Sequence, residues 1–116
     1  MKTVENRIKT LLLKIGVDPS LLGYNYLVEA IKICYADNNV LYRGMTKILY
    51  PEVAKIFDTT PSRVERAMRH SIEKVCDNNP NGFEILVFLP PAILGKYANS
   101  QFIGACIEYL KMNEEE

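Results

Sequence analysis

Apolar residues recur every three or four positions over long stretches of the chain, which is the spacing that buries one face of an α-helix. The first predicted helix runs from Val4 to Ile15 and ends at Gly16, because glycine readily adopts the left-handed backbone that closes a helix. The second runs from about Gly23 to Asp37, where the polar run Asp37-Asn38-Asn39 should break it. A last helix starts near Asn99-Ser100, a good capping pair. The side chains expected to be buried are Val4, Ile8, Leu11, Leu12 and Ile15, then Leu27, Ala30, Ile31 and Cys34, and finally Phe102, Ile103, Cys106, Ile107 and Leu110.

The middle of the chain predicts two short helices. Met45, Ile48 and Leu49 indicate the first of them. The stretch from Pro51 to Phe57 indicates a separate or kinked helix, since proline is tolerated at the first helical position, and its expected core residues are Val53, Ala54 and Phe57. A polar connection over Asp58-Thr59-Thr60 follows.

The segment from about Thr60 to Cys76 predicts a longer helix with two different faces. Thr60 can cap it, and Pro61 would again occupy the first position. The predicted core face carries Val64, Met68, Ser71 and Val75, with Ala67 and Ile72 at its edges. The opposite face carries Ser62, Arg66, Arg69 and Glu73, with Arg63 and His70 along one flank. One side is suited to a core and the other to solvent or a partner.

The run from Phe83 to Leu89 is ambiguous, because a short apolar stretch can be a buried helix or a strand. Helix is the prediction, since every other element is helical, and we expect core here rather than an exposed partner surface. The polar run from Asp77 to Gly82 should separate it from the helix before, and Pro90-Pro91 should end it. The tyrosines Tyr24, Tyr26, Tyr35, Tyr42 and Tyr50 are expected to be half-buried. These elements predict an all-α, single-domain bundle of about six helices over residues 1–116.

Composition narrows the class of protein. Of the 116 residues, 48% are hydrophobic and 24% are charged, and no stretch is long enough to cross a bilayer, so we expect a cytoplasmic globular protein with no membrane contact. The three cysteines have no paired spacing, so free thiols are expected and a metal site is not. No glycine-rich phosphate loop, paired-carboxylate site or nucleophile motif occurs, so we expect neither a cofactor nor an enzyme.

The net charge of zero hides a local concentration of positive charge. Arg63, Arg66, Arg69, His70 and Lys74 lie within one short segment, whereas the chain ends in three glutamates. Two helices joined by a tight turn, with arginines on the second, are typical of a helix-turn-helix, here over about residues 51–76.

An α-helix fits the major groove of DNA, where arginine can donate two hydrogen bonds to guanine. Arg66 and Arg69 are therefore the candidate base readers. Ser62, Arg63, His70 and Lys74 are candidate contacts to the DNA backbone. Glu65 has two open roles, accepting from cytosine or orienting Arg69 four residues on, and the second is slightly favoured.

The residues themselves resemble a known family. The stretch YPEVAKIFDTTPSRVERAMRHSIE is similar to the helix-turn-helix of the C-terminal effector domain of the stage-zero sporulation response regulator. IGVDPSLLGYNYLVEAI and NSQFIGACIEYL resemble flanking parts of the same domain. The resemblance implies a six-helix transcription factor that binds a short DNA box, often as tandem copies. It implies the same site residues, with Arg66, Arg69 and Glu65 at bases and Ser62, Arg63 and His70 at the backbone.

Two departures from the family matter for function. Full-length members carry a receiver domain, and this sequence contains no such segment, so we expect an excised domain or a free-standing relative. The stretch from Asn79 to Tyr97 matches poorly where the family contacts RNA polymerase and neighbouring copies. The competing interpretations are a protein-interaction module that has lost DNA binding, and an inhibitor that pairs with a full-length relative.

Overall fold

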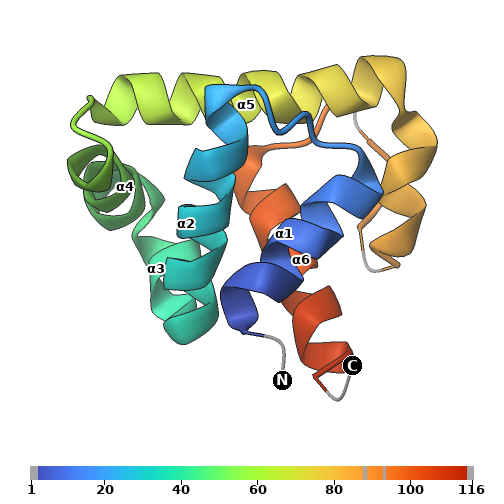
Figure 1. Cartoon of the computed structure of the whole chain (residues 1–116), viewed down its shortest axis with the longest axis horizontal. Coiled ribbons are helices and arrows are strands. Elements are labelled where there is room, and N and C mark those ends of the chain that lie inside the picture. The colour runs from blue at the N-terminus through green and yellow to red at the C-terminus, as the bar shows by residue number, and fades with distance from the viewer. Residues whose placement is uncertain (1–2, 88, 93, 115–116) are drawn as a thin grey trace.

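The computed structural model describes residues 3–87, 89–92 and 94–114 and confirms an all-α architecture over them (Figure 1). The α-helix α2 stands at the centre and packs against α1, α5 and α6, while α5 crosses the top of the bundle. In the described residues, none of the helices is long and apolar enough to span a membrane. The elements are α1 (Val4–Ile15), α2 (Leu22–Ala36), α3 (Asn38–Arg43), the π-helical η1 (Met45–Leu49), α4 (Tyr50–Ile56), α5 (Pro61–Asn78), the 3₁₀ segment η2 (Pro80–Ile85) and α6 (Asn99–Met112).

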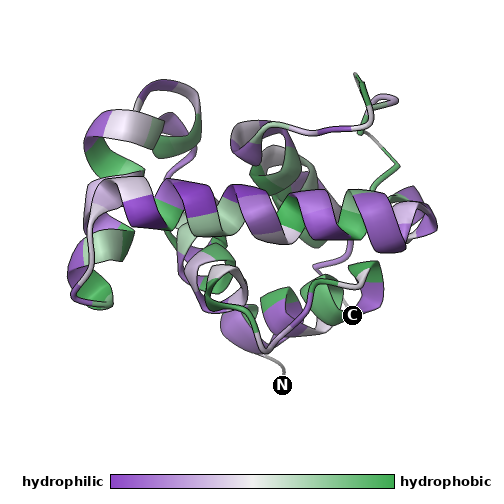
Figure 2. Ribbon diagram, turned by 90° about the horizontal axis from the view of Figure 1, so that it is seen from above, coloured by the Kyte–Doolittle hydropathy of each residue, from purple (hydrophilic) through white to green (hydrophobic). Residues whose placement is uncertain are grey.

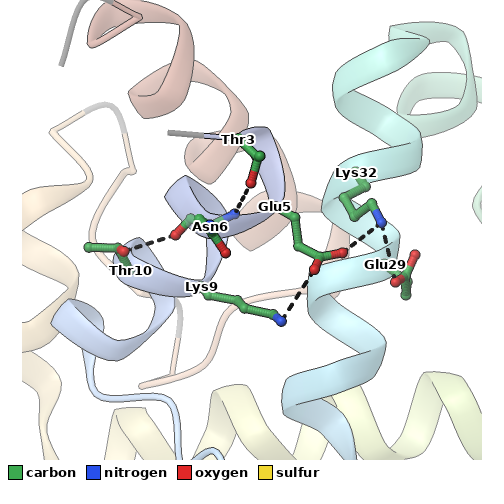
Figure 3. Close-up of polar contacts among 7 residues, drawn as sticks. All are labelled: Thr3, Glu5, Asn6, Lys9, Thr10, Glu29 and Lys32. Atoms are coloured by element: carbon green, nitrogen blue, oxygen red, sulfur yellow. Dashed lines mark hydrogen bonds and ion pairs between the residues drawn. The ribbon is translucent and has the colours of Figure 1, made fainter. Parts of the chain in front are cut away.

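Capping residues fix α1 at both ends, and a carboxylate ties it to α2. The Thr3 hydroxyl accepts from the Asn6 N–H at 3.1 Å, and Gly16 ends the helix with φ 105°. The Glu5 carboxylate lies between two ammonium groups, 3.3 Å from Lys9 Nζ and 2.8 Å from Lys32 Nζ of α2 (Figure 3). Because these side chains are more than a third exposed, such pairs contribute little to stability.

The predicted end of the second helix at Asp37 is confirmed, but the sequence did not predict the short helix α3 that follows it directly. Asp37 ends α2, but its side chain accepts from the Asn39 N–H at 3.0 Å and caps α3 at once. A residue that stops one helix can start the next, because aspartate satisfies the free N–H groups of a first turn. After Gly44 the chain continues as η1, where the Leu49 N–H donates to the Gly44 carbonyl at 2.8 Å, and then passes into α4 without a break.

The turn between α4 and α5 is closed by backbone hydrogen bonds. Asp58 adopts the left-handed conformation at φ 52°. The Thr59 N–H then reaches the Ala54 carbonyl at 2.9 Å, and the Asp58 N–H lies 3.4 Å from the Lys55 carbonyl. This is the Schellman arrangement, and aspartate tolerates it better than most residues other than glycine. The predicted cap is confirmed, since the Thr60 hydroxyl accepts from the Arg63 N–H at 3.2 Å.

Helix α5 approaches α2 more closely than a side chain would allow. The predicted core face of α5 is confirmed, with Val64, Met68, Ser71, Ile72 and Val75 buried. Opposite it, α2 presents Gly23, and a β-carbon there would collide with the Ser71 hydroxyl and the Ala67 carbonyl. The absence of a side chain at Gly23 therefore sets the distance between the two helices.

The prediction of a helix from Phe83 to Leu89 is wrong. The 3₁₀ segment η2 ends at Ile85. Among the described residues of this stretch only Phe83 and Leu86 are buried, while Val87 is exposed. Residues three apart share one side of a 3₁₀ turn, so this pair fits the core without a full helix. The Phe83 ring packs against Phe102 of α6, with 6.0 Å between centroids. Phe88 lies outside the described residues.

The last helix begins one residue away from the predicted cap. Ala98 precedes the helix, and Asn99 is its first helical residue. Asn99 is buried, and its amide Nδ2 donates to the Tyr50 hydroxyl at 3.1 Å and to the Glu65 carbonyl at 3.2 Å. At the other end, the Arg7 guanidinium donates to the carbonyls of Leu110 at 2.6 Å and Asn113 at 2.9 Å. The predicted core residues of α6 are all buried.

Several side chains are more exposed than the sequence predicts. Phe57 is predicted in the core, but it is 37% exposed, and its ring lies beside that of Tyr26 with 5.0 Å between centroids. Tyr42 is 74% exposed, because it lies on the outer side of α3, and is not half-buried. The cysteines are free, and burial raises the pKa of Cys34 to about 11. Val4 is also more exposed than its predicted place in the core implied.

The close contact at Gly23 leads to a first prediction. Gly23→Ala should lower the free energy of unfolding by about 1–3 kcal/mol, because a methyl group must push α5 away from α2. Gly104→Ala in α6 is the matched control, since its β-carbon would lie 3.4 Å from the Leu41 side chain of α3, which is an ordinary van der Waals contact. That change should stabilise the protein by roughly 0.5–1 kcal/mol through helix propensity. Urea unfolding of both variants tests this, and equal effects would contradict it.

A second prediction concerns the loop between α1 and α2. The Ser20 hydroxyl and N–H donate to Asp18, and Lys74 Nζ of α5 lies 3.2 Å from it, so the pKa of Asp18 falls to about 2 from its ordinary value of 3.8. Since the folded pKa is depressed, the stabilisation is present above pH 4 and is lost as the pH falls towards 2.

Urea unfolding at several pH values tests the Asp18 prediction by comparison with Asp18→Asn. The wild-type protein should be the more stable above pH 4, and the difference should close towards pH 2. A difference that does not change across this range would contradict the assignment. Asp77→Asn, at an exposed position near the end of α5, is the control for removing one surface carboxylate.

Candidate nucleic-acid interface

The outer face of α5 is the polar face that its sequence predicts. Ser62, Arg63, Arg66, Arg69 and His70 are all exposed on it. In the view from above, α5 crosses the front of the molecule as a mainly hydrophilic helix (Figure 2). The buried stripe on the other side of the same helix fixes this orientation, because turning α5 would expose Val64 and Met68.

Arg69 is held by carboxylates of its own helix. Its Nε donates to Glu65 Oε2 at 2.9 Å, and its Nη1 lies 3.9 Å from Glu73 Oε1. The hydrogen bond with Glu65 is the main reason that the pKa of Arg69 is raised. The contact corresponds to the orienting role considered for Glu65. The Glu65 side chain is 36% exposed, so its second oxygen can still be reached from outside.

Arg63, Arg66 and His70 differ from Arg69. Among the residues that the structure describes, none of these three side chains forms an ion pair or a hydrogen bond. All three residues are exposed, so their N–H donors are accessible from solvent. A guanidinium group carries five N–H donors in a fixed plane, so each free arginine can meet an external acceptor with two parallel hydrogen bonds.

Lys74 is not gathered with the other site residues. It lies nearer the end of α5, is half-buried, and pairs with Asp18 across the gap to the α1–α2 loop. The Lys74 side chain is 42% exposed, so the pair is open to exchange with solvent. The sequence showed Lys74 close to the arginines along the chain, but it could not show this partner on another element.

Two grooves flank α5, and Arg66 lines both. The first groove, of about 400 Å³, lies on the side of α2 and has an apolar floor. It is lined by Leu22, Tyr26, Thr59, Arg63, Arg66, Ala67 and His70. The second groove, of about 290 Å³, lies on the side of η1 and α4. It is lined by Thr46, Tyr50, Pro61, Ser62, Glu65, Arg66 and Arg69.

Sequence reasoning missed the residues that other elements contribute to these grooves. Leu22 is 68% exposed at the start of α2, and no periodic pattern linked it to α5. Thr46 and Tyr50 come from η1 and from the first residue of α4. Tyr50 precedes Pro51 at a predicted helix start, but that position alone did not indicate that it lies beside α5. The two grooves on either side of Arg66 are therefore formed by several elements of the fold and not by α5 alone.

Comparison with known families agrees with this geometry. The family model described as sporulation initiation factor Spo0A C terminal matches residues 8–110, which includes α5, both groove walls and most of α6. That family consists of DNA-binding regulatory domains of sporulation and is not a family of enzymes. Because the match covers nearly the whole chain, this protein belongs to the Spo0A C-terminal family.

Proposed function

We propose that this protein is a sequence-specific DNA-binding regulator that reads the major groove with α5. The observation that carries the proposal is the exposed ridge of α5, on which Arg66 stands between two grooves with no internal partner in the described part of the chain. The major groove admits one α-helix, and an arginine at the centre of the inserted face can bond to guanine O6 and N7. Membership of a DNA-binding family supports the same reading.

Arg66 and Arg69 would both contact bases, but Arg69 is held by Glu65 before binding and Arg66 is not. Within the described ranges, Arg66 has no internal partner that it must give up on binding. Arg69 is pre-oriented by Glu65 at 2.9 Å, which reduces the rotamer freedom that binding would otherwise have to remove. Glu65 then either keeps Arg69 in place or accepts from cytosine N4 with its exposed oxygen.

The backbone contacts would come from the flanks of α5. Arg63 and His70 line the α2-side groove, and Ser62 lines the other, so each groove offers donors towards a phosphate. The free N–H groups in the first turn of α5 can add to them. Lys74 would take part only by exchanging Asp18 for a phosphate, so we expect a smaller contribution from it.

Binding as tandem copies or a homodimer and contact with RNA polymerase are further proposals that rest on family membership alone. The competing function is a protein-interaction module or an inhibitor of a full-length relative. Val87 and Leu94 support it, because they are 68% and 93% exposed on the segment between η2 and α6. Salt dependence separates the two: DNA binding weakens steeply as salt rises, whereas an apolar protein contact does not.

The test is fluorescence anisotropy with a duplex carrying the family's DNA box and with a scrambled duplex, at two salt concentrations. The wild-type protein should prefer the box. Arg66→Ala should lose about 1–3 kcal/mol of affinity for the box and relax the preference at one base pair. Arg43→Ala, at an exposed arginine of α3, is the matched control and should bind as the wild type does. Equal binding of the wild type to both duplexes, or an unchanged preference in Arg66→Ala, would contradict the proposal.

A further inference from the structure

The groove on the η1 side of α5 contains two hydroxyl groups that no sequence argument assigned to the site. Thr46 belongs to η1 and Tyr50 is the first residue of α4, and both line the groove together with Ser62, Arg66 and Arg69. Thr46 is exposed and Tyr50 is half-buried. Neither residue lies on α5, so their presence beside Arg66 depends on how the preceding segment is packed.

The π-helical hydrogen bonding of η1 places these two residues together. The Leu49 N–H bonds the Gly44 carbonyl at 2.8 Å, five residues back, and the Tyr50 N–H bonds the Met45 carbonyl in the same way. A wide turn of this kind is frequent at functional sites. Residues four apart on such a turn share a side, so Thr46 and Tyr50 both face the groove.

The Tyr50 hydroxyl is fixed in position as a donor. It accepts a hydrogen bond from Asn99 Nδ2 at 3.1 Å, and Asn99 is only 7% exposed. A phenol that accepts one hydrogen bond still has its own proton to donate, and in the described residues no acceptor bonds to that proton. Burial raises the pKa of Tyr50, so the proton remains on the oxygen at neutral pH.

The two grooves differ in the donors that they offer. Arg66 lines both grooves. The α2-side groove adds Arg63 and His70, whereas the η1-side groove adds neutral hydroxyls beside Arg69, whose charge Glu65 offsets. A helix in the major groove runs between the two phosphate backbones, so each of its flanks faces one strand. A phosphate oxygen at the η1-side groove would accept from hydroxyl groups, as in many protein–DNA contacts.

We propose that the hydroxyls of Thr46 and Tyr50 hold a phosphate of the DNA strand opposite the one that faces Arg63 and His70. This inference rests on the proposed function and adds a second wall to the DNA-binding surface. Because these donors are neutral, they release no counterion from DNA. Their contribution therefore differs from that of a lysine or arginine in a way that can be measured.

Thr46→Val and Tyr50→Phe remove one hydroxyl each with little change of shape. Each should weaken binding to the box and to the scrambled duplex by about three- to tenfold, since a neutral hydrogen bond is lost. The base preference and the slope of log affinity against log salt should stay as in the wild type. Thr10→Val on α1 and Tyr42→Phe on α3 are matched controls at exposed positions and should bind as the wild type does. Urea unfolding of each variant shows that the protein is folded under the binding conditions.

A variant that should bind DNA more tightly complements the two variants that should bind it less tightly. Thr46→Lys adds a cation at the same groove, so it should strengthen binding to both duplexes and steepen the salt slope by about 0.9, the value for one more phosphate contact. Thr10→Lys should do neither. If the wild type prefers the box while Thr46→Val, Tyr50→Phe and Thr46→Lys all bind as it does, the inference is overturned and the proposed function stands. If the wild type does not bind DNA, both fall.

Discussion

The close approach of α2 and α5 at Gly23 is the contact on which the DNA-binding surface depends. With no side chain at that position, the backbone of α2 lies directly against Ala67 and Ser71. Helix pairs are normally separated by their side chains, so one glycine determines how deep α5 sits and how far its outer face projects. The exposed arginines lie on the side of α5 opposite this buried contact, so the contact determines how far they project from the bundle.

A second constraint acts on α5 from α6. Asn99 bonds the Glu65 carbonyl, one residue before Arg66, and at the same time bonds Tyr50 at the start of α4. One buried amide thus links both helices of the helix-turn-helix to the C-terminal helix. Its Oδ1 atom and the Ser71 hydroxyl are buried and find no hydrogen-bond partner among the residues that the structure describes. Unsatisfied polar groups reduce stability, so these two atoms mark places where the packing of α5 serves position more than stability.

Strong periodicity made part of this structure predictable. The two faces of α5, the cap at Thr60 and the core of α6 all follow from local spacing and from which residues satisfy a first turn. The end of α2 at Asp37 was predictable, but the start of α3 was not, because a polar run indicates a helix end and a helix start equally well. The segment from Phe83 to Leu89 was misread because composition cannot tell how many apolar side chains the core has room for. In the candidate site, the residues on α5 could be predicted from the sequence. The residues that other elements place beside α5 could not, because only the fold brings them close to it; they are Leu22, Thr46, Tyr50 and Asp18, the partner of Lys74.

The contact of Arg7 with the end of α6 has a practical consequence for building new molecules from this one. Its bonds to the Leu110 and Asn113 carbonyls hold the start of α1 beside the end of α6, on the side of the bundle away from α5 (Figure 1). A short linker could join these neighbouring ends, and new termini could be opened in an exposed loop, to give a circular permutant with the same bundle. A fluorescent reporter attached at either end of this domain would likewise lie on the side opposite α5 and leave the outer face of that helix accessible (Figure 1).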